Sequence, residues 1–219
     1  MAAAPPGTAK SFRPHPSAEP RFRMKPSFSS ASAAGCSSMD DPGLALARAR
    51  ALTAGWGAGA RALSALPAAV VPAPYRTLLD HDRGMTAVLS ERWGEPVGVR
   101  VLRQWTEPDG TALWRDIVLT VGPDARPVEL ASIRIALGGF PAAFAEQLRE
   151  GAEPFGRLLA RNGVAFSVEV LGLLTAPADH VWAAEGRVSS GATLYGRIGR
   201  LVRADGWTIA ETVELLPRA

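Results

Sequence analysis

The stretch LWRDIVLTV, residues 113–121, decides how the middle of the chain folds. It is rich in large apolar and β-branched residues and lies between two turn signals, Asp109-Gly110 and Gly122-Pro123-Asp124, which predicts a strand bounded by hairpin turns. Side chains alternate between the two faces of a strand, so Arg115 belongs to the more apolar face. An arginine there extends to the sheet edge, pairs with a carboxylate, or binds an anion in an enclosed site.

Segments with strand patterning lie on both sides of this stretch. A helix or helix pair over 75–93 precedes them, and helical spacing over 140–162 separates the third strand from the fourth. Hairpin-linked strands favour antiparallel pairing, and the whole pattern predicts an α+β domain with an antiparallel sheet of about six strands. The six expected strands cover residues 97–105, 113–121, 126–137, 164–174, 193–204 and 207–217.

The chain divides into three parts by composition. Residues 1–40 are rich in Pro, Ser and Ala, and we interpret them as a disordered tail because they cannot bury enough apolar surface. Two interpretations of the tail stay open: a transit-like segment, or an extension ahead of a true start at Met39. Residues 41–72 are expected to form an N-terminal helix over 42–65 and a Pro-rich connector, and the compact domain is expected to begin at residue 73.

Charge and cysteine content exclude several classes of function. The formal charge is +3, but the first 39 residues hold five basic and one acidic residue, +4, which leaves the remainder at 3 − 4 = −1. We therefore expect no nucleic-acid partner. Cys36 is the only cysteine and the three histidines are scattered, so a cysteine-based or histidine metal site is not expected. With no membrane-length apolar run, the sequence favours a cytoplasmic monomer without metal or cofactor.

Charged residues inside apolar strands remain as candidates for chemistry, since the common catalytic motifs are missing. Arg115 is one, and the last strand carries Glu211 and Glu214. Alternation alone favours Glu211 as the buried carboxylate. For both Glu211 and Glu214, the alternative to a functional role is a carboxylate that is only solvated or ion-paired. His81 is flanked by aspartates, but adjacent helical residues point in different directions, so we interpret it as a surface histidine at a helix end.

Four motifs in order resemble the chorismate pyruvate-lyase family over about residues 73–219. They are YRTLLDHDRGMTAVL (75–89), LWRDIVLTVGPDARPVELASIRIAL (113–137), EPFGRLL (153–159) and LYGRIGRLVRADGWTIAETVELLP (194–217). The resemblance implies a single antiparallel sheet with helices covering one face and enclosing a buried ligand site, a fold shared with the ligand-sensing UTRA domains of bacterial regulators.

The resemblance also implies site residues. Arg115 would bind a carboxylate and Met85 would line the site, while Phe155 and Gly156 would offer main-chain groups to the other end of the ligand. The acidic residue of the last strand matches Glu214 through VELLP, against the alternation argument for Glu211. Arg115 and Glu214 are thus the expected catalytic pair.

The implied reaction is elimination of pyruvate from chorismate to give 4-hydroxybenzoate or another hydroxybenzoate, with no metal or cofactor. Positioning and preorganised electrostatics would provide the catalysis. The alternative is a non-catalytic domain of the same fold that binds a small aromatic acid. Such sensor domains usually follow a winged helix-turn-helix, which residues 1–72 are not expected to form, so the sequence favours the lyase.

Overall fold

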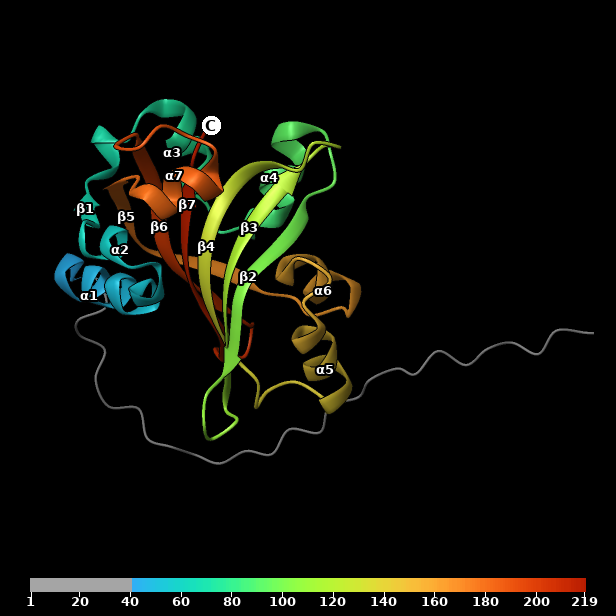
Figure 1. Cartoon of the computed structure of the whole chain (residues 1–219). Coiled ribbons are helices and arrows are strands. Elements are labelled where there is room, and N and C mark those ends of the chain that lie inside the picture. Colours follow the sequence, from blue (N-terminus) through green and yellow to red (C-terminus); the bar gives the residue numbers. More distant parts are fainter. Residues whose placement is uncertain (1–40) are drawn as a thin grey trace, which may run out of the picture. The chain divides into compact units, whose positions relative to one another are not determined.

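The computed structural model describes residues 41–219, which form one antiparallel sheet of seven strands with helices packed on it (Figure 1). The strand order is β1-β5-β6-β7-β4-β3-β2. The α+β class and the antiparallel sheet are confirmed; the predicted tail, Cys36 and the start at Met39 lie outside the described residues. The strands are β1 (Ser64–Leu66), β2 (Gly98–Thr106), β3 (Ala112–Val121), β4 (Arg126–Ala136), β5 (Ser167–Pro177), β6 (Thr193–Val202) and β7 (Thr208–Leu216).

Seven α-helices and two short 3-10 helices connect the strands in the described part of the chain. Four α-helices, α1 (Pro42–Leu52), α2 (Ala58–Arg61), α3 (Ala73–Leu79) and α4 (Met85–Trp93), precede β2, as do the 3-10 helices η1 (Ala54–Trp56) and η2 (Ala68–Val70). α5 (Ala142–Glu150) and α6 (Phe155–Arg161) lie between β4 and β5, as expected. α7 (His180–Gly186) connects β5 to β6.

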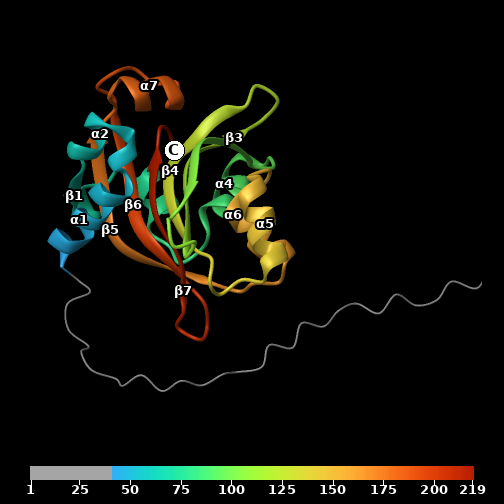
Figure 2. The same ribbon diagram turned by 60° about the horizontal axis from the view of Figure 1, so that its bottom comes forward.

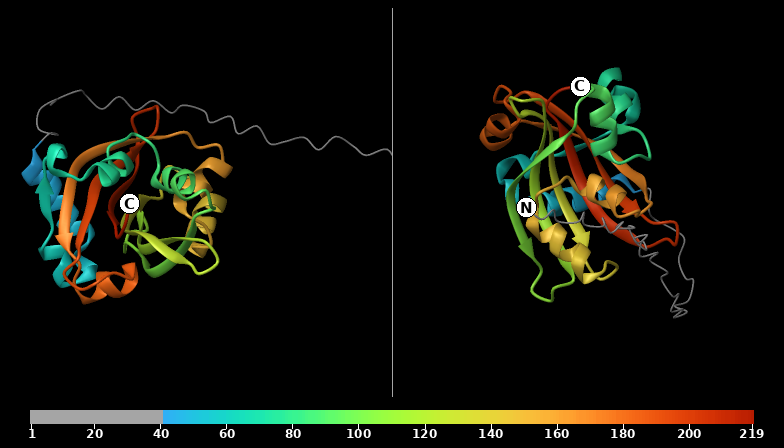
Figure 3. Two further views of the ribbon diagram at one scale, coloured as in Figure 1. Left: turned by 90° about the horizontal axis from the view of Figure 1, so that it is seen from above. Right: turned by 90° about the vertical axis from the view of Figure 1, so that its right-hand side faces the viewer.

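The helices cover both faces of the sheet, so the expectation of one covered face is wrong. α1, η1 and α7 pack on the face formed by side chains such as Val118, Leu130 and Val213. α3 to α6 pack on the opposite face, which carries Ile117, Ala131 and Ile133 (Figures 2 and 3). Adjacent strand positions face opposite sides of the sheet, so covering both sides explains why β3 and β4 are buried along almost their whole length.

Several predicted boundaries differ from the structure. The helix expected over 42–65 ends at Leu52, and the chain then turns at Gly57 (φ 83°) and adds β1 to the edge of the sheet by pairing with β5. The helical segment 140–162 is divided into α5 and α6 at Gly151 (φ 69°). α7 was not predicted, because its seven residues are too few to show a helical period.

One glycine allows β6 and β7 to approach each other. A Cβ built on Gly196 would lie 2.2 Å from the carbonyl oxygen of Glu214, so any side chain there forces the two strands apart. We expect Gly196→Ala to lower the free energy of unfolding by about 1–3 kcal/mol. Chemical denaturation measures this, with Gly138→Ala as the matched control because no heavy atom lies within 4 Å of a Cβ built there. Equal stability of the two variants would contradict the close approach.

Candidate functional site

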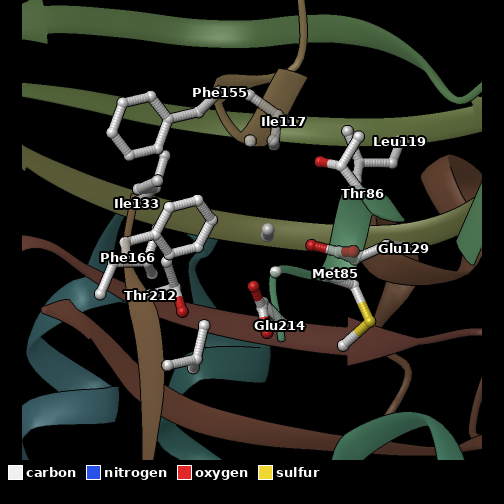
Figure 4. A pocket seen from close by; sticks show the side chains of 15 residues that line it. Met85, Thr86, Ile117, Leu119, Glu129, Ile133, Phe155, Phe166, Thr212 and Glu214 are labelled. Atoms are coloured by element: carbon white, nitrogen blue, oxygen red, sulfur yellow. The ribbon is translucent and has the colours of Figure 1, made fainter. Parts of the chain in front are cut away.

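A small cavity lies between the sheet and helices α4 and α6. Its volume is about 50 Å³, which is room for a few water molecules and much less than the ~300–1,000 Å³ of a typical ligand pocket. Carboxyl and hydroxyl groups from the sheet face apolar side chains across it (Figure 4). The lining residues are Gly84, Met85, Thr86, Ile117, Leu119, Glu129, Ala131, Ile133, Phe155, Gly156, Phe166, Val168, Leu201, Thr212 and Glu214.

Strand register sets which residues meet in this cavity. One row across the sheet runs Ile117, Ala131, Glu214, Arg197, from β3 to β6. Ala131 is the small residue of the row and lies between Ile117 and the carboxylate of Glu214, which leaves space above the sheet. The next row runs Arg115, Ile133, Thr212. The α-carbons of Arg115 and Thr212 are two strand spacings, about 10 Å, apart.

Glu214 is held by a buried ion pair. Nε of Arg197 donates to Oε2 of Glu214 at 2.5 Å, and the Arg197 side chain is fully buried. The other guanidinium nitrogens of Arg197 donate to main-chain carbonyls: Nη1 to Leu79 (3.1 Å) and His81 (3.0 Å), and Nη2 to Arg83 (3.3 Å). The cation is therefore compensated on all sides, and it connects the carboxylate in the cavity to the segment before α4.

Glu129 brings a second carboxyl group to the same cavity. It is 2% exposed, and its Oε2 has no hydrogen-bond partner among the described residues. Burial, and then the negative charge of Glu214, raise its pKa well above the ordinary value, while Arg197 acts in the opposite direction. These effects favour the protonated carboxyl, which can donate one hydrogen bond.

Arg115 is buried beside the cavity but does not line it. Its Nε donates to Oε1 of Gln104 at 2.6 Å. Its Nη2 lies close to Gly151 and has no hydrogen-bond partner among the described residues. None of the ion pairs between residues 41 and 219 includes Arg115. Burial lowers its pKa to about 10, so the side chain is still a cation at neutral pH. Its positive charge is left uncompensated.

The structure brings most of the predicted site residues together. Met85, Phe155, Gly156 and Glu214 all line the cavity. Arg115 lies two positions from Ile117 along β3 and pairs with Ile133, and both isoleucines line the cavity. Their roles toward a ligand stay predictions. Sequence reasoning missed Glu129, Thr212 and Arg197. Glu129 alternates with Ala131 and Ile133, so the parity argument applied to Arg115 would have found it. Arg197 carried a weaker signal, because Gly199 rather than a large apolar residue follows it on the same face of the strand.

The alternation argument for Glu211 is wrong. Glu211 lies on the opposite face of β7, partly exposed and paired with Arg48 at 3.5 Å, while Glu214 points into the cavity. The register of β7 is regular from Ala210 to Leu215 against β4, so no bulge shifts the parity there. The pattern failed because Val213 and Leu215 are buried on the other covered face, which made both faces look apolar.

His81 is also different from its prediction. It lies in the turn between α3 and α4, half-buried rather than on the surface, with Nδ1 3.2 Å from Nη1 of Arg197. Its Nε2 lies 2.9 Å from the carbonyl of Leu78. Burial, and then Arg197, lower its pKa.

Between residues 41 and 219, no group of three or more His, Cys, Asp or Glu side chains is arranged to hold a metal ion. No helix in this range is long and apolar enough to cross a membrane.

Comparison with known proteins finds similarity only among solved structures. No family model and no curated protein matches the chain. The effector domain of PhnF from Mycobacterium smegmatis superposes with a TM-score of 0.48 and 18% identity, over 62% of this chain and 91% of that domain. Complete PhnF gives 0.47 and 18%, over 61% of this chain and 63% of PhnF.

A GntR-family transcriptional regulator from Enterococcus faecalis gives a TM-score of 0.39 with 9% identity, over 54% of this chain and 92% of that one. The first of these three structures is named as an effector domain and the third as a transcriptional regulator. At these TM-scores the similarity carries no argument about ligand or activity. Membership of the chorismate pyruvate-lyase family stays a prediction.

The raised pKa of Glu129 makes stability depend on pH. Above the unfolded pKa of about 4.3, the unfolded state releases this proton while the folded state retains it, so this residue costs increasing stability as pH rises toward its folded pKa. We expect Glu129→Gln, which keeps the shape without the acid, to raise the melting temperature more at pH 8 than at pH 5. Thermal unfolding at both pH values measures it. Glu211→Gln is the control. An equal increase in the melting temperature of Glu129→Gln at both pH values would contradict a buried carboxyl that titrates.

Proposed function

We propose that the cavity and Arg115 together form a binding site for a small aromatic carboxylic acid, with 4-hydroxybenzoate as the model ligand. The observation that carries the proposal is Arg115 itself. Its side chain is a cation, only 2% of the residue is exposed, and it has no carboxylate partner among the described residues. Its buried Nη2 has no hydrogen-bond partner there. Burying an unpaired charge is costly, so such a site favours an anion that supplies the missing charge. A guanidinium binds a carboxylate through two parallel hydrogen bonds.

The groups beyond Arg115 suit the rest of such a ligand. Ile117, Ile133 and Phe155 provide apolar and aromatic surface next to the arginine. At the far side, the hydroxyl of Thr212 and Oε2 of Glu129 are buried without partners in the described chain. A ligand with a carboxylate at one end, a ring in the middle and a hydroxyl at the other would satisfy all three polar groups.

The site must enlarge to admit such a ligand. A cavity of about 50 Å³ is too small for an aromatic ring, and it does not reach Arg115. Binding therefore includes movement of a segment that encloses the cavity.

A second candidate function is the chorismate lyase reaction, favoured by the raised pKa of Glu129 beside Glu214, which pairs with Arg197. In that reaction the C3–O bond to the enolpyruvyl group of chorismate breaks as the ether oxygen takes up one proton, and C4 loses one proton while the electron pair of its C–H bond makes the ring aromatic. The released enol then tautomerises to pyruvate. Glu129 rather than Glu214 would donate a proton to the departing ether oxygen, because Arg197 already pairs with Glu214.

Arg115→Met tests the binding site directly. We expect the dissociation constant for 4-hydroxybenzoate to rise at least about tenfold, because a charged hydrogen bond is lost, while the melting temperature rises because an uncompensated buried cation is removed. Titration calorimetry and thermal unfolding measure the two effects. Arg100→Met, which removes a partly exposed arginine paired with Glu185, is the control. Unchanged affinity in Arg115→Met would overturn the proposed function.

Incubation with chorismate separates the two candidates. A lyase releases pyruvate and a hydroxybenzoate in equal amounts without added metal, and the activity falls at least about tenfold in Glu129→Gln, the range expected for loss of a general acid. Pyruvate is followed with lactate dehydrogenase and the aromatic product by chromatography. Binding of 4-hydroxybenzoate without pyruvate release would leave the binding function and exclude the lyase.

A further inference from the structure

The segment 80–84, between α3 and α4, borders the cavity at its last residue. Its last residue, Gly84, lines the cavity together with Met85 and Thr86, which begin α4. Asp80, Asp82 and Arg83 are exposed on the outer side. The segment thus contacts the cavity at Gly84 and solvent through these three side chains.

Few contacts hold this segment to the sheet. Arg197 on β6 donates to the main-chain carbonyls of His81 and Arg83, as well as to Leu79 at the end of α3. One main-chain hydrogen bond is added where the amide of Val168 on β5 donates to the carbonyl of Asp82 at 2.7 Å. Arg197 thus supplies most of the hydrogen bonds between the sheet and the segment.

The contacts of His81 require a neutral ring. Nδ1 lies 3.2 Å from Nη1 of Arg197 and accepts from the main-chain amide of Arg83 at 3.2 Å; both partners are donors, so Nδ1 must be an acceptor. Nε2 then carries the proton and donates to the carbonyl of Leu78. A proton added at Nδ1 would meet two donors, one of them a cation.

We propose that Asp80–Gly84 is a pH-sensitive lid over the cavity, latched by Arg197 and released when His81 becomes protonated. The imidazolium repels the guanidinium of Arg197, which weakens the bonds from Arg197 to the lid carbonyls and opens the way to the cavity. The proposal rests on the proposed function in one respect, that the cavity is the ligand site.

The other charges near His81 do not remove this repulsion. Arg83 on the lid adds positive charge, and Glu214 on β7 favours the imidazolium but already pairs with Arg197. Glu129 on β4 lies close to Glu214 and Arg197, and its carboxyl is held toward the neutral form. Asp80 and Asp82 are exposed neighbours in the sequence, where solvent screens their charges.

Amide hydrogen exchange of the full chain tests the lid without a ligand. The amide of Val168 reports opening, because it donates to the carbonyl of Asp82 when the lid is closed. The amide of Arg83 reports protonation of His81, because it donates to Nδ1 of His81 within the lid. An open lid with an ordinary histidine pKa of about 6.5 is populated about tenfold more at pH 5.5 than at pH 7.5. We expect exchange at these two amides, corrected for intrinsic rates, to increase by about that factor.

His81→Asn keeps an acceptor oxygen for Arg197 but does not titrate, so its exchange at both amides should not change with pH. His180→Asn, at the start of α7, is the control and should retain the wild-type change. Equal protection of the wild type at both pH values, or the full increase in His81→Asn, would overturn the proposal. If His81→Asn does not fold, the wild type alone provides the test. The pH midpoint of His81 protonation, followed by NMR, must then equal the pH midpoint of the increase in amide exchange. Two different midpoints would overturn the proposal.

A ligand measurement distinguishes failure of the lid from failure of the site. Stopped-flow mixing with 4-hydroxybenzoate should show an association rate constant about tenfold higher at pH 5.5 than at pH 7.5, and no such change in His81→Asn. Absence of 4-hydroxybenzoate binding at both pH values contradicts the proposed ligand, while the exchange data still decide whether the lid opens. Binding whose association rate does not depend on pH supports the site and contradicts the lid.

Discussion

The buried ion pair between Arg197 and Glu214 is the interaction on which the site depends. Two neighbouring strands place the pair on one face of the sheet, and the guanidinium uses its remaining donors to hold the chain before α4. Removing either partner would leave a buried charge, which costs several kcal/mol. The same contacts therefore stabilise the sheet, orient a carboxylate into the cavity and fix its cover.

The charges on this face explain why an anion is the favoured ligand. Arg197 is neutralised by Glu214, and Glu129 is driven toward its neutral form by burial and by that same carboxylate. Of the two arginines that are buried in the described chain, Arg197 and Arg115, Arg115 is the one without a carboxylate partner. A monoanionic ligand would complete the balance, and its apolar part would contact the isoleucine and phenylalanine side chains between the two polar ends.

Much of the architecture could be predicted from the chain alone. The turn signals around LWRDIVLTV and the apolar strands on both sides of it led to the antiparallel sheet, and β2, β3 and β4 pair as hairpins. The edge strand β1 and helix α7 were missed because three and seven residues are too short to show a period. Alternation also failed for Glu211, since helices cover both faces of the sheet.

By itself, the sequence determined the fold class, and the order of its motifs predicted that Arg115, Met85, Phe155, Gly156 and Glu214 belong to one site. Only the tertiary structure decided which charges meet. Arg197 and Glu214 are 17 residues apart and Arg197 and His81 more than a hundred, and strand register with the packing of the segment before α4 brings them together. Local patterns record which residues are buried, but the partner of a buried charge depends on contacts between distant segments.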